Sequence, residues 1–127
     1  MGVFVSIRGW VEVCDEHVPL IRALIERDED HIGHYADAWC FQTFGGGFSR
    51  FVFFGCTVRA AAVVQVRAQV RRIAETVVTH DGPDVDYPQG DFLLEHESHE
   101  SEPEQYPLTR WRFSRGAFLE TRENDAF

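Results

Sequence analysis

The stretch VFVSIRGWVEV, Val3 to Val13, alternates between two kinds of side chain along its whole length. Successive residues of a β-strand point to opposite faces of a sheet, so a period of two predicts a strand. One face is almost entirely apolar and β-branched, as expected beside a core. Its members are Val3, Val5, Ile7, Val11 and Val13, with Gly9 in the same row. The other face is mixed and carries two aromatic residues, Phe4 and Trp10.

Two segments have the residue spacing of amphipathic helices. The first, Asp15 to Glu29, repeats apolar residues at helical intervals and places Pro19 in its first turn, where a missing N–H costs little. The second, Thr57 to Val78, has one continuous apolar stripe, and its opening threonine can cap the helix. The stripe consists of Val63, Val66, Val70, Ile73 and Val77.

Four more strands are predicted from apolar runs: Ala38–Phe44, Ser49–Cys56, Asp91–His99 and Leu108–Glu120. Three glycines between the first two indicate a hairpin, and the Gly- and Pro-containing segment His80–Gly90 indicates a loop. The element order is therefore β-α-β-β-α-β-β. It predicts an α+β fold in a single domain, residues 1–127, with a mostly antiparallel sheet and two helices on one face. The first six elements follow the ferredoxin-like order, and the last strand is extra.

Two helices can cover only one face of such a sheet. Phe4 and Trp10 lie on the face of the first strand that is opposite its valine and isoleucine row. Either the sheet curls on itself and buries these aromatic residues, or the second face is a contact surface for a partner. Both alternatives are open at the level of sequence.

The acidic residues are concentrated in one segment, Asp81 to Glu104. The chain has 21 acidic residues, 12 basic residues (all arginine) and a net charge of −9, and this segment holds nine carboxylates and no lysine or arginine. A negative charge disfavours nucleic acid and anionic membranes as partners and favours a basic protein. The candidate contact residues here are Asp84, Asp86, Asp91, Glu95, Glu97, Glu100, Glu102 and Glu104. The alternative is a solvated acidic segment without a partner.

No metal or cofactor site is predicted. His96 and His99 would face opposite sides of one strand, and His31 and His34 lie at a helix end. None of these spacings matches a recognised zinc motif. The carboxylates of the acidic segment lie among turn residues, where water keeps their pKa values near the ordinary range. Acid–base catalysis instead needs a carboxylic acid whose pKa is raised by an apolar pocket.

The cysteines indicate free thiols in a reducing compartment. Cys14, Cys40 and Cys56 are an odd number without a CxxC pair, which argues against disulfides. Cys14 and His17 are close enough in sequence to pair, although a thiol at a strand end is the simpler interpretation. The longest apolar run is far too short to span a membrane, and no signal peptide is visible. We therefore expect a cytoplasmic protein.

The C-terminal segment RWRFSRGAFLETREND, Arg110 to Asp125, resembles the signature of the immunity protein 7 family of bacterial polymorphic-toxin systems. The family pattern alternates aromatic residues and arginine, continues with a small residue, Arg and Gly, and ends with an apolar pair and an acidic residue. The matching residues are Trp111, Arg112, Phe113, Arg115, Gly116, Leu119 and Glu120. Gly9-Trp10 is similar to a Gly-Trp pair in the family's first strand, although Arg8 precedes it where the family usually has His.

This resemblance implies a protein that neutralises a cognate toxin, often a nuclease, by stoichiometric binding and is not an enzyme. The expected contact surface is the acidic segment together with Trp10 and Trp111, although Trp111 can equally serve to lock the last strand into the sheet. The alternative is a ferredoxin-like small-ligand binder or enzyme that forms a homodimer through its open sheet face. It predicts a deep pocket lined by Trp10 and Phe113. An acidic structural subunit is a third possibility.

Overall fold

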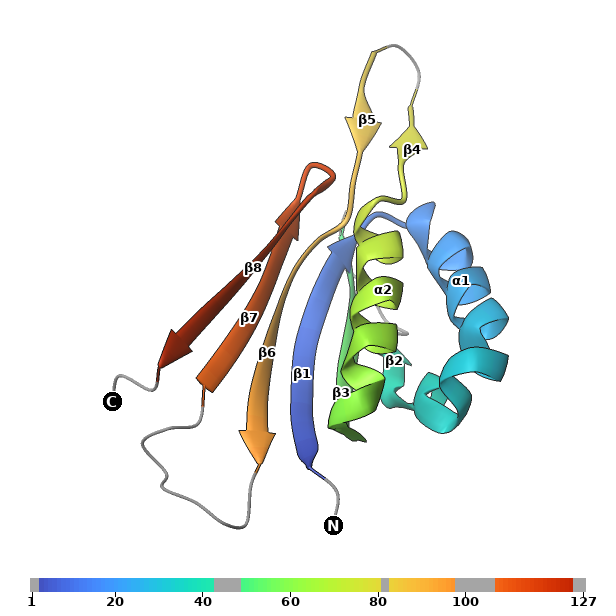
Figure 1. Cartoon of the computed structure of the whole chain (residues 1–127). Helices are drawn as coiled ribbons and strands as arrows, with labels where there is room; N and C mark the ends of the chain where they lie inside the picture. Colours follow the sequence, from blue (N-terminus) through green and yellow to red (C-terminus); the bar gives the residue numbers. More distant parts are fainter. Residues whose placement is uncertain (1–2, 43–48, 81–82, 98–106, 125–127) are drawn as a thin grey trace.

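The computed structural model describes residues 3–42, 49–80, 83–97 and 107–124 (Figure 1). Its strands and helices are β1 (Phe4–Val13), α1 (His17–Ile32), β2 (Trp39–Phe41), β3 (Arg50–Arg59), α2 (Val63–Ala74), β4 (Val78–Thr79), β5 (Val85–Asp86), β6 (Gln89–Glu97), β7 (Pro107–Ser114) and β8 (Ala117–Asn124). Two 3₁₀ helices, Gly33–Ala38 and Ala60–Ala62, precede β2 and α2.

The main sheet has six strands in the order β2-β3-β1-β6-β7-β8, and every neighbouring pair is antiparallel. The first four follow the ferredoxin-like order, which confirms the predicted α+β class. The β7–β8 hairpin extends the sheet beyond β6, and β4 and β5 form a separate two-stranded ribbon (Figure 1). Neither described helix combines the length and hydrophobicity needed to cross a membrane.

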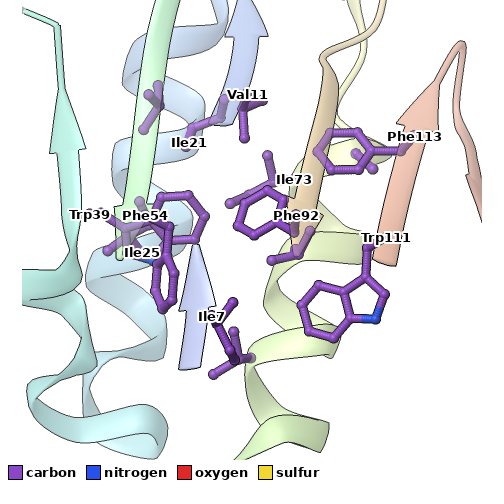
Figure 2. Close-up of a cluster of buried hydrophobic side chains, with 14 of the residues drawn as sticks. Ile7, Val11, Ile21, Ile25, Trp39, Phe54, Ile73, Phe92, Trp111 and Phe113 are labelled. Carbon is purple, nitrogen blue, oxygen red and sulfur yellow. The ribbon is translucent and has the colours of Figure 1, made fainter. Parts of the chain in front are cut away.

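The core lies between the helices and one face of the sheet. The predicted apolar row of β1 supplies Val5, Ile7, Val11 and Val13, which are at most 4% exposed. Helix α1 adds Ile21 and Ile25, and α2 adds Val66, Val70 and Ile73 of its predicted stripe, as Figure 2 shows for several of these side chains. The other two members of the stripe differ: Val63 is only partly buried, and Val77 lies beyond the end of α2 at Ala74 and is 44% exposed. Because burial of an aliphatic side chain contributes roughly 1.5–3 kcal/mol, this cluster is the main source of stability.

Two strand glycines make room for aromatic rings in that core. A Cβ on Gly9 would lie 2.4 Å from Cγ of Phe92 and 2.7 Å from the carbonyl oxygen of Asp91. A Cβ on Gly90 would lie 2.4 Å from Cζ of Phe113. The rings of Phe92 and Phe113 therefore lie directly over the backbone of neighbouring strands, where only glycine leaves space.

A buried polar network joins the two helices to β2. Nε1 of Trp39 donates a hydrogen bond to Oε1 of Gln69 at 2.9 Å, and Nε2 of Gln69 donates to Oδ2 of Asp28 at 3.2 Å. Nη2 of Arg72 donates to the same carboxylate oxygen at 2.6 Å. Since Asp28 is only 4% exposed, these hydrogen bonds replace those that its carboxylate would otherwise make to water. The network fixes the packing of α1 against α2.

The second helix begins later than the sequence pattern predicted. Thr57 does not cap it, because Thr57 and Val58 pair with Ser6 and Val5 of β1 and extend β3 to Arg59. The helix itself starts at Val63. Pairing with the full length of β1 therefore overrides the helical periodicity of these residues.

The predicted last strand, Leu108–Glu120, is a hairpin of two strands. Arg115 and Gly116 form a two-residue turn with φ of 52° and 81°, between the paired residues Ser114 and Ala117. Positive φ at both central positions is typical of a type I′ turn, whose twist suits a β-hairpin. Arg115 and Gly116 thus reverse the direction of the chain inside the segment predicted as one strand. Within the predicted loop His80–Gly90, the structure has β5 and the start of β6.

Candidate functional site: an uncovered sheet face

The face of the main sheet opposite α1 and α2, here called the open face, is not covered by any described helix or strand (Figure 1). Strand register identifies its members, because residues paired across neighbouring strands point to the same side. The central ones are Ser6, Arg8, Trp10 and Glu12 of β1, Phe51, Phe53 and Gly55 of β3, Gln89, Asp91, Leu93 and Glu95 of β6, Leu108, Arg110 and Arg112 of β7, and Ala117, Leu119 and Thr121 of β8. Among the described residues, therefore, the helices cover one face of the sheet and nothing covers the other.

Aromatic side chains cluster on the β1–β3 part of the open face. Trp10 is 37% exposed and Phe53 is 47% exposed. Trp10 meets Phe51 edge to face at a centroid distance of 6.0 Å, and Phe51 stacks with Phe53 at 6.1 Å. At the other end of the face, Leu119 is 59% exposed. Large apolar groups held beside one another in solvent are typical of a protein-binding surface.

Ion pairs between strands neutralise most of the charge on the open face. Arg8 of β1 pairs with Glu95 of β6. Asp91 lies between two arginines of β7, with Oδ1 3.2 Å from Nε of Arg110 and Oδ2 3.5 Å from Nε of Arg112. These pairs orient the guanidinium groups of Arg8, Arg110 and Arg112 along β1 and β7 of the open face. The described part of the face is therefore amphipathic rather than acidic.

Two shallow depressions hollow the open face, each with a volume of about 410 Å³. The first is lined by Arg8, Gly9, Trp10, Phe53, Phe54, Asp91, Leu93 and Arg110. The second is lined by Gln89, Gly90, Asp91, Arg112, Phe113, Ser114, Ala117 and Leu119. They meet at Asp91, but Trp10 and Phe113 line different depressions. The described residues therefore do not form the single deep pocket that the small-ligand alternative predicts.

The acidic candidates do not lie together. Asp84 and Asp86 are exposed at the β4–β5 ribbon. Asp91 and Glu95 lie on β6, which is an interior strand between β1 and β7, so the expected acidic edge is wrong for these two residues. Glu97 ends β6 opposite Phe4. The remaining candidates, Glu100, Glu102 and Glu104, lie outside the described residues.

Trp111, one of the two predicted aromatic contacts, is completely buried and is not available to a partner in the folded chain. Its register places it on the core face of β7, opposite Glu120 of β8. Nε1 of Trp111 donates a hydrogen bond to Oε1 of Glu120 at 2.8 Å, and Nε of Arg67 in α2 donates to the same oxygen at 2.9 Å. The structural alternative for Trp111 is therefore the correct one.

The other residues of the C-terminal signature divide between core, turn and open face. Phe113 packs in the core, and Arg115-Gly116 makes the β7–β8 turn. Arg112 and Leu119 pair across the hairpin on the open face. Arg115 makes no ion pair with any described carboxylate. Most of the signature thus builds the hairpin, while two of its residues reach the candidate surface.

The hydrogen bonds that Glu120 accepts from Trp111 and Arg67 can be tested through their pH dependence. Burial raises the pKa of Glu120, but hydrogen bonds from Trp111 and Arg67, with the charges of Arg67 and Arg122, outweigh burial and leave the pKa below its ordinary value. A carboxylate with a lowered folded-state pKa stabilises the fold above its unfolded-state pKa and loses that effect as the pH falls through the folded-state pKa. We expect Glu120→Gln to lower the free energy of unfolding by about 1 kcal/mol at pH 7. This value is smaller than is usual for a charged hydrogen bond because Glu120 is partly exposed to water.

The difference between wild type and Glu120→Gln should shrink on acidification in urea unfolding curves, since protonation removes the same charge from the wild type. Glu26→Gln, on the exposed side of α1, is the control for loss of one surface carboxylate. A stability difference that is constant from pH 7 to acid would contradict the assigned role of Glu120.

The side chains of Cys14 and His17 are in contact, as their spacing in the sequence allowed, but His17 does not activate the thiol as a nucleophile. Sγ of Cys14 lies 3.1 Å from Nδ1 of His17. Burial raises the pKa of the Cys14 thiol, and this effect outweighs hydrogen bonds from the backbone that lower it, so the unreactive thiol form is favoured. The other two cysteines, Cys40 and Cys56, are also free thiols.

Sequence reasoning found Trp10 but missed the ion pairs that surround it. Arg8 and Glu95 are separated by 87 positions, and their contact depends on the pairing of β1 with β6. One signal in the sequence pointed to these ion pairs. Arg110 and Arg112 alternate with Trp111 and Phe113, which places both arginines on the same face of a strand, opposite the core.

No protein-family model, no curated protein and no solved structure matches the chain. The resemblance to the immunity protein 7 family therefore rests on the quoted residues alone.

Proposed function

We propose that this chain is an immunity protein that binds and neutralises a cognate toxin domain in the bacterial cytoplasm. It acts by occupying the toxin in a one-to-one complex and catalyses no reaction. The observation that carries the proposal is the open face, where Trp10 and Phe53 remain exposed although the fold has a complete core elsewhere. The resemblance of the C-terminal signature adds the toxin as the class of partner.

The open face has the composition that favours tight protein binding. Interfaces gain most of their affinity from a few aromatic and arginine side chains near their centre. Here Trp10 lies between Phe53 of β3 and Asp91 of β6, with Arg8 and Arg110 lining the same depression. Because cross-strand pairs hold Arg8 and Arg110, little side-chain entropy is lost when a partner covers them.

The acidic segment has a separate role in this proposal, because it attracts a basic toxin before contact. Long-range attraction raises the association rate and is screened by salt, whereas buried contacts determine mainly the dissociation rate. Replacing Glu100, Glu102 and Glu104 with Lys should slow association about tenfold at low salt and change the dissociation rate little. Stopped-flow association at several salt concentrations measures this. An unchanged association rate at every ionic strength would remove the acidic segment from the proposal.

The proposal is tested by co-expression with the toxin domain encoded next to this chain. We expect growth to be restored and the two purified proteins to elute as a one-to-one complex. Restored growth without a complex would contradict stoichiometric binding, and a complex without restored growth would instead support the structural-subunit alternative. If growth is not restored and no complex forms, the proposal is overturned.

The alternative use of the open face is a homodimer of a small-ligand-binding protein. The two adjoining depressions favour only the homodimer, since together they could receive side chains of a second copy; they do not supply the single deep ligand pocket. Sedimentation equilibrium separates the two functions. The immunity proposal predicts that the toxin competes with any self-association, because both would use Trp10 and Phe53.

A further inference from the structure

Three different metal-binding side chains meet at the end of β1. Cys14 follows β1, His80 follows β4, and Asp86 ends β5. Each offers a ligand atom, and these atoms all lie within 4.8 Å of one another. Ligand atoms around a zinc ion lie roughly 3–4 Å apart, given metal–ligand distances near 2 Å, so small rotations would bring the three into range.

A buried histidine holds two of these residues in place. His17 is completely buried at the start of α1. Its Nδ1 accepts a hydrogen bond from the backbone N–H of Cys14 at 3.2 Å, so its Nε2 carries the proton and donates to the carbonyl oxygen of Asp86 at 3.1 Å. His17 thereby ties the end of β1 to β5 through backbone groups, and its Nδ1 also lies 3.1 Å from Sγ of Cys14.

The third residue, His80, is also oriented. Its backbone N–H donates to the carbonyl oxygen of Asp84 at 3.1 Å. Its Nε2 faces Oδ2 of Asp86 at 2.5 Å, and its Nδ1 lies 3.6 Å from Oε2 of Glu16. Metal-binding histidines commonly direct their second nitrogen toward a carboxylate, which fixes the ring and increases its basicity. Glu16 is placed for that role if Nε2 binds the metal.

Solvent can reach the cluster. Cys14, His17 and Asp86 line a depression of about 330 Å³, together with Glu12, Val13, Ser49, Tyr87 and Gln89. A metal ion can therefore enter, and one coordination position is left for water or for an atom of a ligand.

We propose that Cys14, His80 and Asp86 form a zinc-binding site. Sulfur and imidazole ligands select zinc and similar transition metals over magnesium and calcium, which require oxygen ligands. Zinc displaces the proton of a coordinating thiol, which becomes a thiolate ligand. The bound ion would clamp the β4–β5 ribbon to the junction of β1 and α1. This inference does not rest on the toxin-binding proposal: the site shares no residue with the aromatic cluster of the open face, and Asp86 is the one ligand that also belongs to the acidic segment.

The test uses Co²⁺ as a spectroscopic substitute for zinc and a competing chelator to measure zinc affinity. We expect one equivalent of Co²⁺ to produce a sulfur-to-cobalt charge-transfer band in the wild type, under anaerobic conditions. The band should vanish in Cys14→Ser. His80→Gln and Asp86→Asn should each weaken zinc binding at least about 100-fold, and Glu16→Gln about tenfold, the range for supporting carboxylates.

Matched controls separate this site from adventitious binding. Cys40→Ser removes an exposed thiol outside the cluster and should keep the band. If Cys14→Ser fails to fold by circular dichroism, His80→Gln and Asp86→Asn still decide the outcome, because they leave the contact between Cys14 and His17 in place. The absence of a band, its loss in Cys40→Ser, or wild-type affinity in both His80→Gln and Asp86→Asn would each overturn the proposal.

Discussion

Replacing Trp10 with alanine is expected to weaken binding of the toxin by about 30- to 1,000-fold, the equivalent of roughly 2–4 kcal/mol for a central aromatic contact. Trp10 is 37% exposed in the free protein and lines the first depression beside Phe53. A partner that covers it removes a large apolar surface from water, and alanine leaves a void in its place. Surface plasmon resonance should show the loss mainly as a faster dissociation rate.

The matched control for Trp10→Ala is Leu20→Ala on α1. Leu20 is similarly exposed, at 45%, but belongs to the helical side of the molecule. We expect Leu20→Ala to bind the toxin as tightly as the wild type does. Equal affinities for the wild type and Trp10→Ala would show that the toxin binds elsewhere.

Replacing Gly9 with alanine is expected to destabilise the fold by about 3 kcal/mol, the upper range for inserting a methyl group into a packed core. The added Cβ would overlap the ring of Phe92 and also the carbonyl oxygen of Asp91. The ring could turn only by disturbing Trp39, Trp111 and the other aromatic groups packed around it (Figure 2). The backbone oxygen could move only by distorting the pairing of β1 with β6.

Gly55→Ala is the matched control, because Gly55 lies in the neighbouring strand β3 and a Cβ there would have no atom within 4 Å. This substitution should leave stability unchanged or raise it by up to about 1 kcal/mol, since alanine costs less conformational entropy than glycine. Urea unfolding of the two variants measures the difference. If Gly9→Ala and Gly55→Ala were equally stable, Gly9 would not have the packing role assigned to it.

The sequence predicted the order of elements because local periodicity survives wherever one face is buried. The alternation of Val3–Val13 identified both faces of β1 correctly. The last strand was predicted wrongly because the two-residue turn shifts the alternation by one position. Odd-numbered residues face the core before the turn, and even-numbered residues face it afterwards. Trp111 and Phe113 face the core, but after Arg115-Gly116 the core residue is Phe118, and Leu119 faces solvent. The spacing of Trp111, Phe113, Ala117 and Leu119 at roughly alternate positions, interrupted only by Arg115, concealed that reversal.

The candidate surfaces were less predictable because they depend on strand register. Net charge drew attention to Asp91 and Glu95, yet their arginine partners come from β1 and β7 and remove much of that charge. Trp10 and Trp111 are the same residue type in similar strand patterns, but only Trp10 points away from the helices. The cluster of Cys14, His80 and Asp86 spans three elements and has no motif spacing, so no local pattern could reveal it.

The central claim is that the toxin binds the open face, and one comparison tests it most directly. Phe53→Glu places a charge among the exposed aromatic residues, whereas Val64→Glu places the same charge on α2 at a valine that is 73% exposed. Both variants should fold, since both sites are in contact with water. In the co-expression growth assay, we predict that Phe53→Glu loses protection and Val64→Glu retains it. Full protection by Phe53→Glu, or loss of protection only in Val64→Glu, would contradict the claim.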